Sequence, residues 1–172
     1  MAGQDLPEAL DRWAEAKPDH PFLVWEPRDG DSRRWTYRAF RDEIARIASG
    51  LKARGVVAGD KVLIHADNCP EAVLAWYACA WLGAVGVTTN TRRVGAEIEY
   101  FAEHTGCVGA ITQPRYAALV AEHARKLSWI CVTEDDGGLV PNEADAQARD
   151  RHEPFSALAD GADPLPRRAP DP

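Results

Sequence analysis

Two short polar segments of this sequence carry residue types that could do chemistry. His65-Ala66-Asp67-Asn68 follows one apolar run, and Asn90-Thr91-Arg92-Arg93 follows another. A histidine close to an aspartate suggests acid–base chemistry. Two guanidiniums at one strand end suggest phosphate binding, because each can form paired, charge-assisted hydrogen bonds with phosphate oxygens.

The first segment also has a structural interpretation. Neighbouring residues of a strand point to opposite faces, so His65 and Asp67 share a face only if the strand continues that far. Asp67 or Asn68 could instead form a turn and cap the helix expected to begin at Pro70. No G-x-S-x-G motif supplies a nucleophilic serine nearby. The turn and cap are therefore the favoured interpretation.

The second segment is the better candidate for a binding site. Its two arginines could hold a phosphate, but they could also be solvated or paired with Glu97 or Glu99 on the next helix. The residues alone leave these alternatives open. The whole segment Asn90-Thr91-Arg92-Arg93 is the candidate binding site at this point.

Several common kinds of site have no support in the sequence. Neither a G-x-G-x-x-G nor a G-x-x-x-x-G-K-[ST] phosphate loop follows a strand. The cysteines form no C-x-x-C pair, and the ligand-like spacing of His104 and Cys107 has no second pair to complete a metal site. We therefore predict reduced core cysteines, a cytoplasmic setting and no metal site. The four cysteines are Cys69, Cys79, Cys107 and Cys131.

Alternating strand and helix patterns must position the two polar segments. The expected order is strand 62–64, helix 70–82, strand 85–88, helix 96–104, strand 108–112, helix 116–126 and strand 129–133. Strands that are apolar throughout, alternating with helices, predict a mostly parallel sheet covered on both faces. Right-handed crossovers make this a doubly wound α/β fold.

The two ends of the chain have different patterns. At the start we expect a helix at 6–16 capped by Asp5, a β-hairpin from 22–25 and 34–36, and a helix running from Thr36 to Gly55. After Glu134 the pattern weakens, although Phe155 and Leu158 could add one packed turn. We therefore divide the chain into an α/β subdomain at 1–134 and a weakly ordered loop with a Pro/Asp-rich linker at 135–172.

Charge and hydropathy exclude some functional classes. A net charge of -7, with no long basic stripe, argues against a nucleic-acid surface. The uncharged stretch 72–90 contains Gly83 and Gly86 and becomes polar at Thr88, so it fits a buried helix and a strand better than a membrane span. The first residues have neither a basic nor an apolar export signal.

A set of longer motifs resembles a known family. The motifs are W-T-Y-R-A-F at 35–40, A-S-G-L-K-A-R-G-V-V-A-G-D-K-V at 48–62, H-A-D-N-C-P-E at 65–71 and G-A-V-G-V-T-T-N-T-R at 83–92. Together they resemble the N-terminal segment of ATP-dependent acyl-CoA synthetases, the AMP-binding or adenylate-forming enzymes. The resemblance covers roughly 21–133 and is strongest to carnitine/crotonobetaine-type and fatty-acid-type CoA ligases.

The resemblance implies a reaction that this chain cannot complete alone. Such enzymes join a carboxylic acid to AMP and then to CoA, using ATP and Mg²⁺, through motifs that come later in the family's sequence. We therefore expect a truncated domain with no catalytic residues, inactive alone, whose partner is the missing C-terminal portion. In some relatives the arginine at the position of Arg92 contacts the nucleotide phosphates of CoA, although Thr91 replaces the usual proline here. The resemblance therefore makes Arg92 and Asn90 the candidate residues for binding a CoA phosphate.

Two other functions are alternatives to the ligase fragment. One is a non-catalytic binding or assembly module that pairs with another chain or forms a homodimer through an exposed apolar face. The other is an unrelated flavodoxin-like nucleotide binder, which the absent phosphate loop disfavours.

Overall fold

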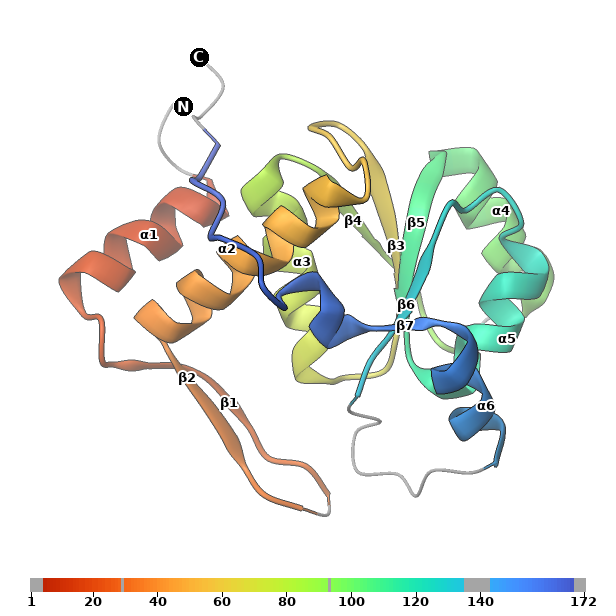
Figure 1. Cartoon of the computed structure of the whole chain (residues 1–172), viewed down its shortest axis with the longest axis horizontal. Coiled ribbons are helices and arrows are strands. Elements are labelled where there is room, and N and C mark those ends of the chain that lie inside the picture. The colour runs from red at the N-terminus through yellow and green to blue at the C-terminus, as the bar shows by residue number, and fades with distance from the viewer. Residues whose placement is uncertain (1–4, 29, 93, 135–142, 169–172) are drawn as a thin grey trace.

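The computed structural model describes residues 5–28, 30–92, 94–134 and 143–168 (Figure 1). Its elements, in chain order, are α1 (Leu6–Ala16), β1 (Pro21–Trp25), β2 (Arg33–Thr36), α2 (Tyr37–Ala53), β3 (Lys61–His65), α3 (Pro70–Leu82), β4 (Val85–Thr88), α4 (Gly95–Thr105), β5 (Cys107–Thr112), α5 (Pro114–His123), β6 (Ile130–Val132), α6 (Glu143–Arg151), β7 (Glu153–Pro154) and the 3₁₀ turn η1 (Phe155–Leu158).

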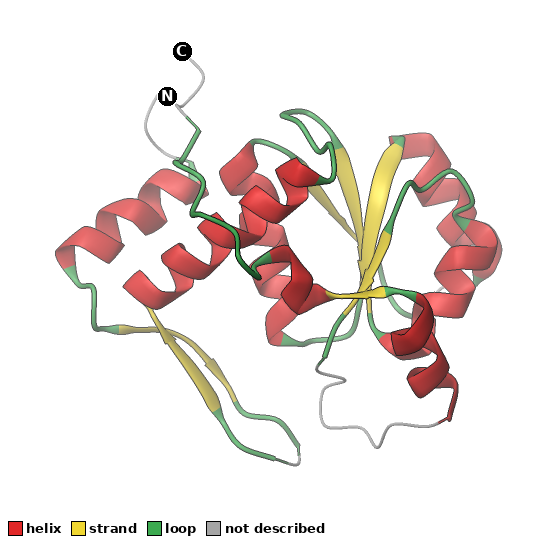
Figure 2. Cartoon of the chain, in the orientation of Figure 1, coloured by secondary structure: helices red, strands yellow, loops and turns green. Residues whose placement is uncertain are grey.

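A five-stranded parallel sheet forms the centre of the molecule. Its strand order is β4-β3-β5-β6-β7, so the chain leaves β3 toward one edge and then crosses back to extend the other. Helices cover both faces, as Figure 2 shows, with α2 and α3 on one face and α4 and α5 on the other. This confirms the predicted doubly wound α/β fold.

Strand β3 shows why the sheet is covered on both faces. Val62 and Ile64 pack with α2 and α3, while Leu63, which lies between them, packs with α4 and α5. All three side chains are buried. Because successive side chains point to opposite faces of a strand, an uninterrupted apolar run requires a cover on each face.

The N-terminal elements follow the predicted local signals. Asp5 caps α1 by accepting a hydrogen bond from the N–H of Glu8 at 2.7 Å. Thr36 caps α2 in the same way, through the N–H of Ala39 at 3.2 Å. Between the two helices, β1 and β2 form the predicted antiparallel hairpin, which projects from the start of α2 (Figure 1).

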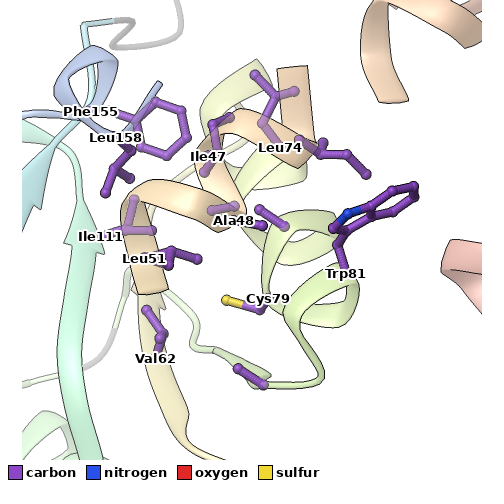
Figure 3. Close-up of a cluster of buried hydrophobic side chains, with 14 of the residues drawn as sticks. Ile47, Ala48, Leu51, Val62, Leu74, Cys79, Trp81, Ile111, Phe155 and Leu158 are labelled. Carbon is purple, nitrogen blue, oxygen red and sulfur yellow. The ribbon is translucent and has the colours of Figure 1, made fainter. Parts of the chain in front are cut away.

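The largest apolar cluster lies between α2, α3 and the sheet (Figure 3). Helix α2 contributes Ile47 and Leu51, and η1 closes the cluster with Phe155 and Leu158, which confirms the predicted packed turn. The approach is closest at Gly50, where a Cβ atom would lie 2.0 Å from the carbonyl oxygen of Leu158. The absence of a side chain at Gly50 therefore lets η1 rest directly on α2.

The C-terminal region holds more structure than its sequence pattern predicts. Helix α6 packs on α5, and β7 adds a short parallel strand beside β6. Beyond η1, residues 162–168 form no helix or strand, but they lie against the N-terminal helices. The N–H of Leu165 donates to the Ala45 carbonyl at 3.0 Å, and its own carbonyl accepts from Trp81 Nε1 at 2.8 Å. The division of the chain at residue 134 stays a prediction.

Some helix ends differ from the predicted ones. Helix α4 extends one residue further at each end than predicted, and α5 begins at Pro114 and ends at His123 rather than spanning 116–126. Proline at the first position of α5 is favourable because its missing N–H would have no helical partner there.

The cysteines behave as predicted. All four are free and buried, and burial raises the pKa of Cys79 and of Cys131 to about 12. Thiols with such pKa values stay protonated and unreactive near neutral pH. No helix in the described part of the chain is both long and apolar enough to cross a membrane.

Candidate binding site at the carboxyl end of the sheet

The sheet has a switch point between β3 and β5. These strands are neighbours, with His65 paired to Thr112 at their carboxyl ends. The chain continues from β3 into α3 on one face and from β5 into α5 on the other. Such a divergence opens a crevice at the strand ends, which is the usual ligand position in open α/β sheets. The first polar segment, 65–68, and the described residues 90–92 of the second lie at this edge.

Asp67 connects three elements at the switch point. Its Oδ1 accepts a hydrogen bond from the Thr91 hydroxyl, and its Oδ2 accepts one from the Tyr116 hydroxyl at 2.7 Å. Its backbone N–H donates to the Oε1 atom of the fully buried Gln113 at 3.0 Å. The carboxylate thus joins the ends of β3 and β4 to the first turn of α5.

The predicted cap of α3 is wrong. The N-cap residue of α3 is Cys69, and no side chain among the described residues caps this helix with a hydrogen bond. Pro70 at the first helical position, together with Glu71 in the first turn, favours the helix start without one. Asp67 is therefore free to bond with the neighbouring loops.

Hydrogen bonds hold Asp67 in its ionised form. Burial would raise the pKa of Asp67, but the hydroxyls of Thr91 and Tyr116 and the nearby Arg115 guanidinium together outweigh it, so the pKa lies below its usual value. Burial and the bond to Asp67 raise the pKa of Tyr116, which keeps the phenol protonated as a donor. An ionised carboxylate with both oxygens engaged is a poor general base.

His65 lies beneath this network. Its side chain is fully buried, its Nδ1 lies 2.8 Å from Thr89 Oγ1, and the Tyr116 ring meets it edge-on at 5.1 Å. Its Nε2 has no hydrogen-bond partner among the described residues. Burial lowers the pKa of His65, against a smaller opposing effect of Asp67. No hydrogen bond joins His65 to Asp67 in the described part of the chain, so the structure does not form an acid–base pair from them.

Asn90 and Arg92 lie in the loop after β4, and both are exposed. The Asn90 Oδ1 atom accepts the N–H of Arg92 at 2.9 Å, which closes a tight turn around Thr91. Within the described residues the Arg92 guanidinium pairs with neither Glu97 nor Glu99. Arg93, the second arginine of the predicted pair, lies outside the described residues.

Three residues of this edge were missed from sequence. Gln113, Arg115 and Tyr116 follow β5 just as His65 and Asp67 follow β3. A signal for them exists, because polar residues directly after adjacent parallel strands meet at one edge. Using it requires the strand order, and the sequence pattern does not show that β5 lies beside β3.

The other spacing noted in the sequence forms no site. His104 stacks on the Tyr100 ring at 5.1 Å, and Cys107 Sγ lies 3.1 Å from the Thr105 hydroxyl. No group of three or more potential metal ligands occurs among the residues that the structure describes.

The geometry agrees with comparisons to known proteins. The family model described as AMP-binding enzyme matches residues 10–172. The chain belongs to the AMP-binding enzyme family. A crotonobetaine/carnitine–CoA ligase from Salmonella enteritidis is 30% identical over 158 residues, which are 87% of this chain and 30% of that protein. The corresponding ligase of Citrobacter koseri is 29% identical and aligns over 83% of this chain and 28% of its own length.

Solved structures show the same fold. An anthranilate CoA ligase, solved with anthranoyl-AMP, matches 98% of this chain with a TM-score of 0.78 and 18% identity. The acetoacetyl-CoA synthetase of Streptomyces lividans matches 96% with a TM-score of 0.76 and 21% identity. The match spans only 30% and 26% of those two chains. The chain is thus an N-terminal segment of the AMP-binding fold, as the sequence motifs predict.

The match to the AMP-binding family includes the residues at the carboxyl edge of the sheet. The loop of Asn90 and Arg92 and the Asp67 network lie at the switch point, and the matched region includes both. Both structural neighbours are CoA-dependent enzymes by description, but at this low identity the likeness establishes only the fold. The chemistry at this edge must therefore be argued from the residues themselves.

Proposed function

We propose that this chain forms the N-terminal part of an ATP-dependent acyl-CoA ligase. The reaction would convert a carboxylic acid, ATP and CoA to acyl-CoA, AMP and pyrophosphate through an acyl-adenylate. The supporting observation is that the AMP-binding family model matches residues 10–172, while the chain spans about 30% of the curated ligases it resembles. The sequence motifs of this chain resemble those of carnitine/crotonobetaine-type and fatty-acid-type CoA ligases, so a carnitine-like acid or a fatty acid is the first substrate to test.

ATP and Mg²⁺ would be held by sequence that this chain does not contain. It has no Ser/Thr/Gly-rich loop ending in lysine, which is the segment expected to hold the phosphates. We therefore propose that the chain is inactive alone and that its partner is the remaining portion of the same enzyme.

The loop after β4 is the part of this chain that we propose for CoA. A phosphate of CoA would meet the Arg92 guanidinium, which is exposed and has no ion pair within the described residues. The Asn90 Oδ1 is engaged by the N–H of Arg92, so its Nδ2 is the group left to donate to the same phosphate. A planar guanidinium suits this role because it binds two phosphate oxygens at once.

The first experiment extends the coding sequence beyond the Pro172 codon and assays ATP–pyrophosphate exchange over a panel of carboxylic acids. We expect exchange and CoA-dependent turnover from a longer product and neither from the 172-residue chain. Exchange by the short chain would contradict its proposed inactivity. In the longer product, Arg92→Ala should raise the KM for CoA by about tenfold, whereas Arg12→Ala, an exposed arginine on α1, should not change it.

One observation favours a second candidate function, a non-catalytic assembly module. β4 is the edge strand of the sheet, and Val85 on it is 49% exposed. Trp76 on α3, which packs over Gly86 of the same strand, is 40% exposed. An edge strand flanked by exposed apolar side chains favours pairing with another chain or a homodimer. Light scattering after size-exclusion chromatography distinguishes the two: a defined dimer that Val85→Lys dissociates would support the module.

A further inference from the structure

We infer that Asp67 is a positioning residue that holds the Asn90–Arg92 loop in the shape required to bind a phosphate group of CoA. The inference rests on the proposed contact between Arg92 and CoA. It assigns to Asp67 a role other than the acid–base chemistry or the helix cap that its position suggests.

The geometry of the carboxylate carries the inference. Thr91 lies between Asn90 and Arg92, and its hydroxyl donates to Asp67 Oδ1. Asn90 Oδ1 in turn accepts a hydrogen bond from the Arg92 N–H at 2.9 Å. These two hydrogen bonds hold the turn, one to the segment after β3 and one within the loop itself. The direction in which the Arg92 side chain leaves the loop is thereby defined.

Asp67 is itself held firmly to the sheet. Its N–H bonds to the buried Gln113 side chain, and the Tyr116 hydroxyl occupies its second oxygen. Two residues before Asp67, the His65 carbonyl accepts a hydrogen bond from the Thr112 hydroxyl at 2.7 Å. These bonds fix the Asp67 carboxylate at the β3/β5 switch point. An exposed loop that is bonded to it therefore loses much of its conformational freedom.

The charge of Asp67 separates positioning from direct binding. A carboxylate repels a phosphate, so removing it should strengthen phosphate binding if charge alone mattered. If Asp67 instead orders the loop, its removal should weaken binding, because the guanidinium is no longer held in position. The two explanations predict opposite signs for one measurement.

The first test reads the order of the loop without any ligand. Amide hydrogen exchange of Arg92 is measured by NMR in the 172-residue chain, in Asp67→Ala and in Thr91→Val, with circular dichroism to confirm folding. We expect faster exchange at Arg92 in both variants and no change in Asn68→Ala, a substitution of the exposed residue next to Asp67. Thr91→Val keeps the carboxylate and the sheet intact, so an unchanged exchange rate in that variant overturns the inference.

The second test measures binding of adenosine 3′,5′-bisphosphate, a probe that carries the nucleotide phosphates of CoA. Weak binding, followed through the amide signals of residues 90–92, should fall by about tenfold in Arg92→Ala, in Asp67→Ala and in Thr91→Val. Asp67→Ala combined with Arg92→Ala should weaken binding no further than either alone.

The outcomes distinguish the two proposals. If Arg92→Ala weakens binding while Asp67→Ala strengthens it or leaves it unchanged, the positioning role fails and the proposed phosphate contact stands. If Arg92→Ala leaves binding unchanged, the phosphate contact fails, and the exchange rates then decide only whether Asp67 orders the loop.

Discussion

The Tyr116 hydroxyl donates a hydrogen bond to Asp67 Oδ2 at 2.7 Å, across 49 positions of sequence. It joins the segment after β3 to the first turn of α5, at the point where the chain departs to opposite faces of the sheet. The same phenol ring rests edge-on against the buried His65. One tyrosine thus links the polar network at the sheet edge to the core below it.

Removal of this hydroxyl should destabilise the fold. We expect Tyr116→Phe to lower the free energy of unfolding by about 1–2 kcal/mol, because one oxygen of a partly buried carboxylate loses its donor. The measurement is urea denaturation near neutral pH. Tyr100→Phe is the matched control, since Tyr100 is 59% exposed, and it should change stability by less than about 0.5 kcal/mol. Equal stability of Tyr116→Phe and Tyr100→Phe would mean that the Tyr116 hydroxyl contributes nothing to the free energy of unfolding.

The buried His65 should make stability depend on pH. Its folded pKa lies below the reference value of 6.5, so the unfolded chain takes up a proton near that pH while the folded chain does not. Because the unfolded state then binds more protons, stability falls as the pH decreases below about 6.5 and until the folded pKa is reached.

Comparison with His65→Gln isolates this effect. Denaturation is measured at several pH values from about 7.5 to about 5.5, and the stability of the wild type should decline more steeply than that of the variant. His152, whose pKa burial also lowers, contributes equally to both proteins and cancels in the difference. Parallel pH profiles would show that His65 does not stay neutral in the folded chain.

Most of the elements could be predicted from sequence because their signals are local. Caps such as Asp5 and Thr36, the apolar run of β3 and the glycine after α3 each act over a few residues. The family motifs in the same region located the segment within the AMP-binding fold. These signals do not depend on which strands become neighbours.

The site could be predicted only in part, because it is made by strand order. Arg92 and Asp67 were visible as strand-end residues, but the bonds of Asp67 to Thr91 and Tyr116 require β4 and β5 to lie on either side of β3. The sequence immediately before Pro70 indicated a turn, which favoured Asp67 or Asn68 as the cap of α3. In the structure the Asp67 carboxylate instead accepts hydrogen bonds from Thr91 and Tyr116, and it does not cap α3.

Helix α6 was missed for a different reason. Its buried positions include Ala148, which packs with Ala117 of α5 and Val132 of β6. Alanine contributes little to a hydrophobic pattern, so a helix that docks through small residues looks like a charged loop. Its contact with α5 supplies the stabilisation that its own sequence does not display.

Gly50 should be sensitive to a single added methyl group. Alanine is the better helix former by about 1 kcal/mol, but its Cβ would lie 2.0 Å from the Leu158 carbonyl oxygen. Overpacking at a backbone contact costs about 1–3 kcal/mol, so we expect Gly50→Ala to destabilise the chain in urea denaturation. Ser49→Ala, one position earlier on α2, should be within about 0.5 kcal/mol of wild type. A stabilised Gly50→Ala would mean that η1 does not rest on α2.

The segment after η1 should be held to the N-terminal helices rather than free. Trp81 Nε1 bonds to the Leu165 carbonyl, and Arg167 Nε lies 3.5 Å from the Asp11 carboxylate. Trp81→Phe removes the donor and also part of a buried ring, since Trp81 is 3% exposed, so the loss of stability should be about 2–3 kcal/mol. We expect faster hydrogen exchange at the Leu165 amide, which otherwise bonds to the Ala45 carbonyl.

Trp13→Phe controls for the replacement of an indole that does not contact the Leu165 carbonyl, since Trp13 is 39% exposed on α1. It should leave the Leu165 exchange rate unchanged. The result also tests the division of the chain at residue 134. Protection of Leu165 that depends on Trp81 joins the last described residues to the α/β subdomain, because their backbone bonds then form part of its stability. Rapid exchange at Leu165 in the wild type would instead support a separate linker.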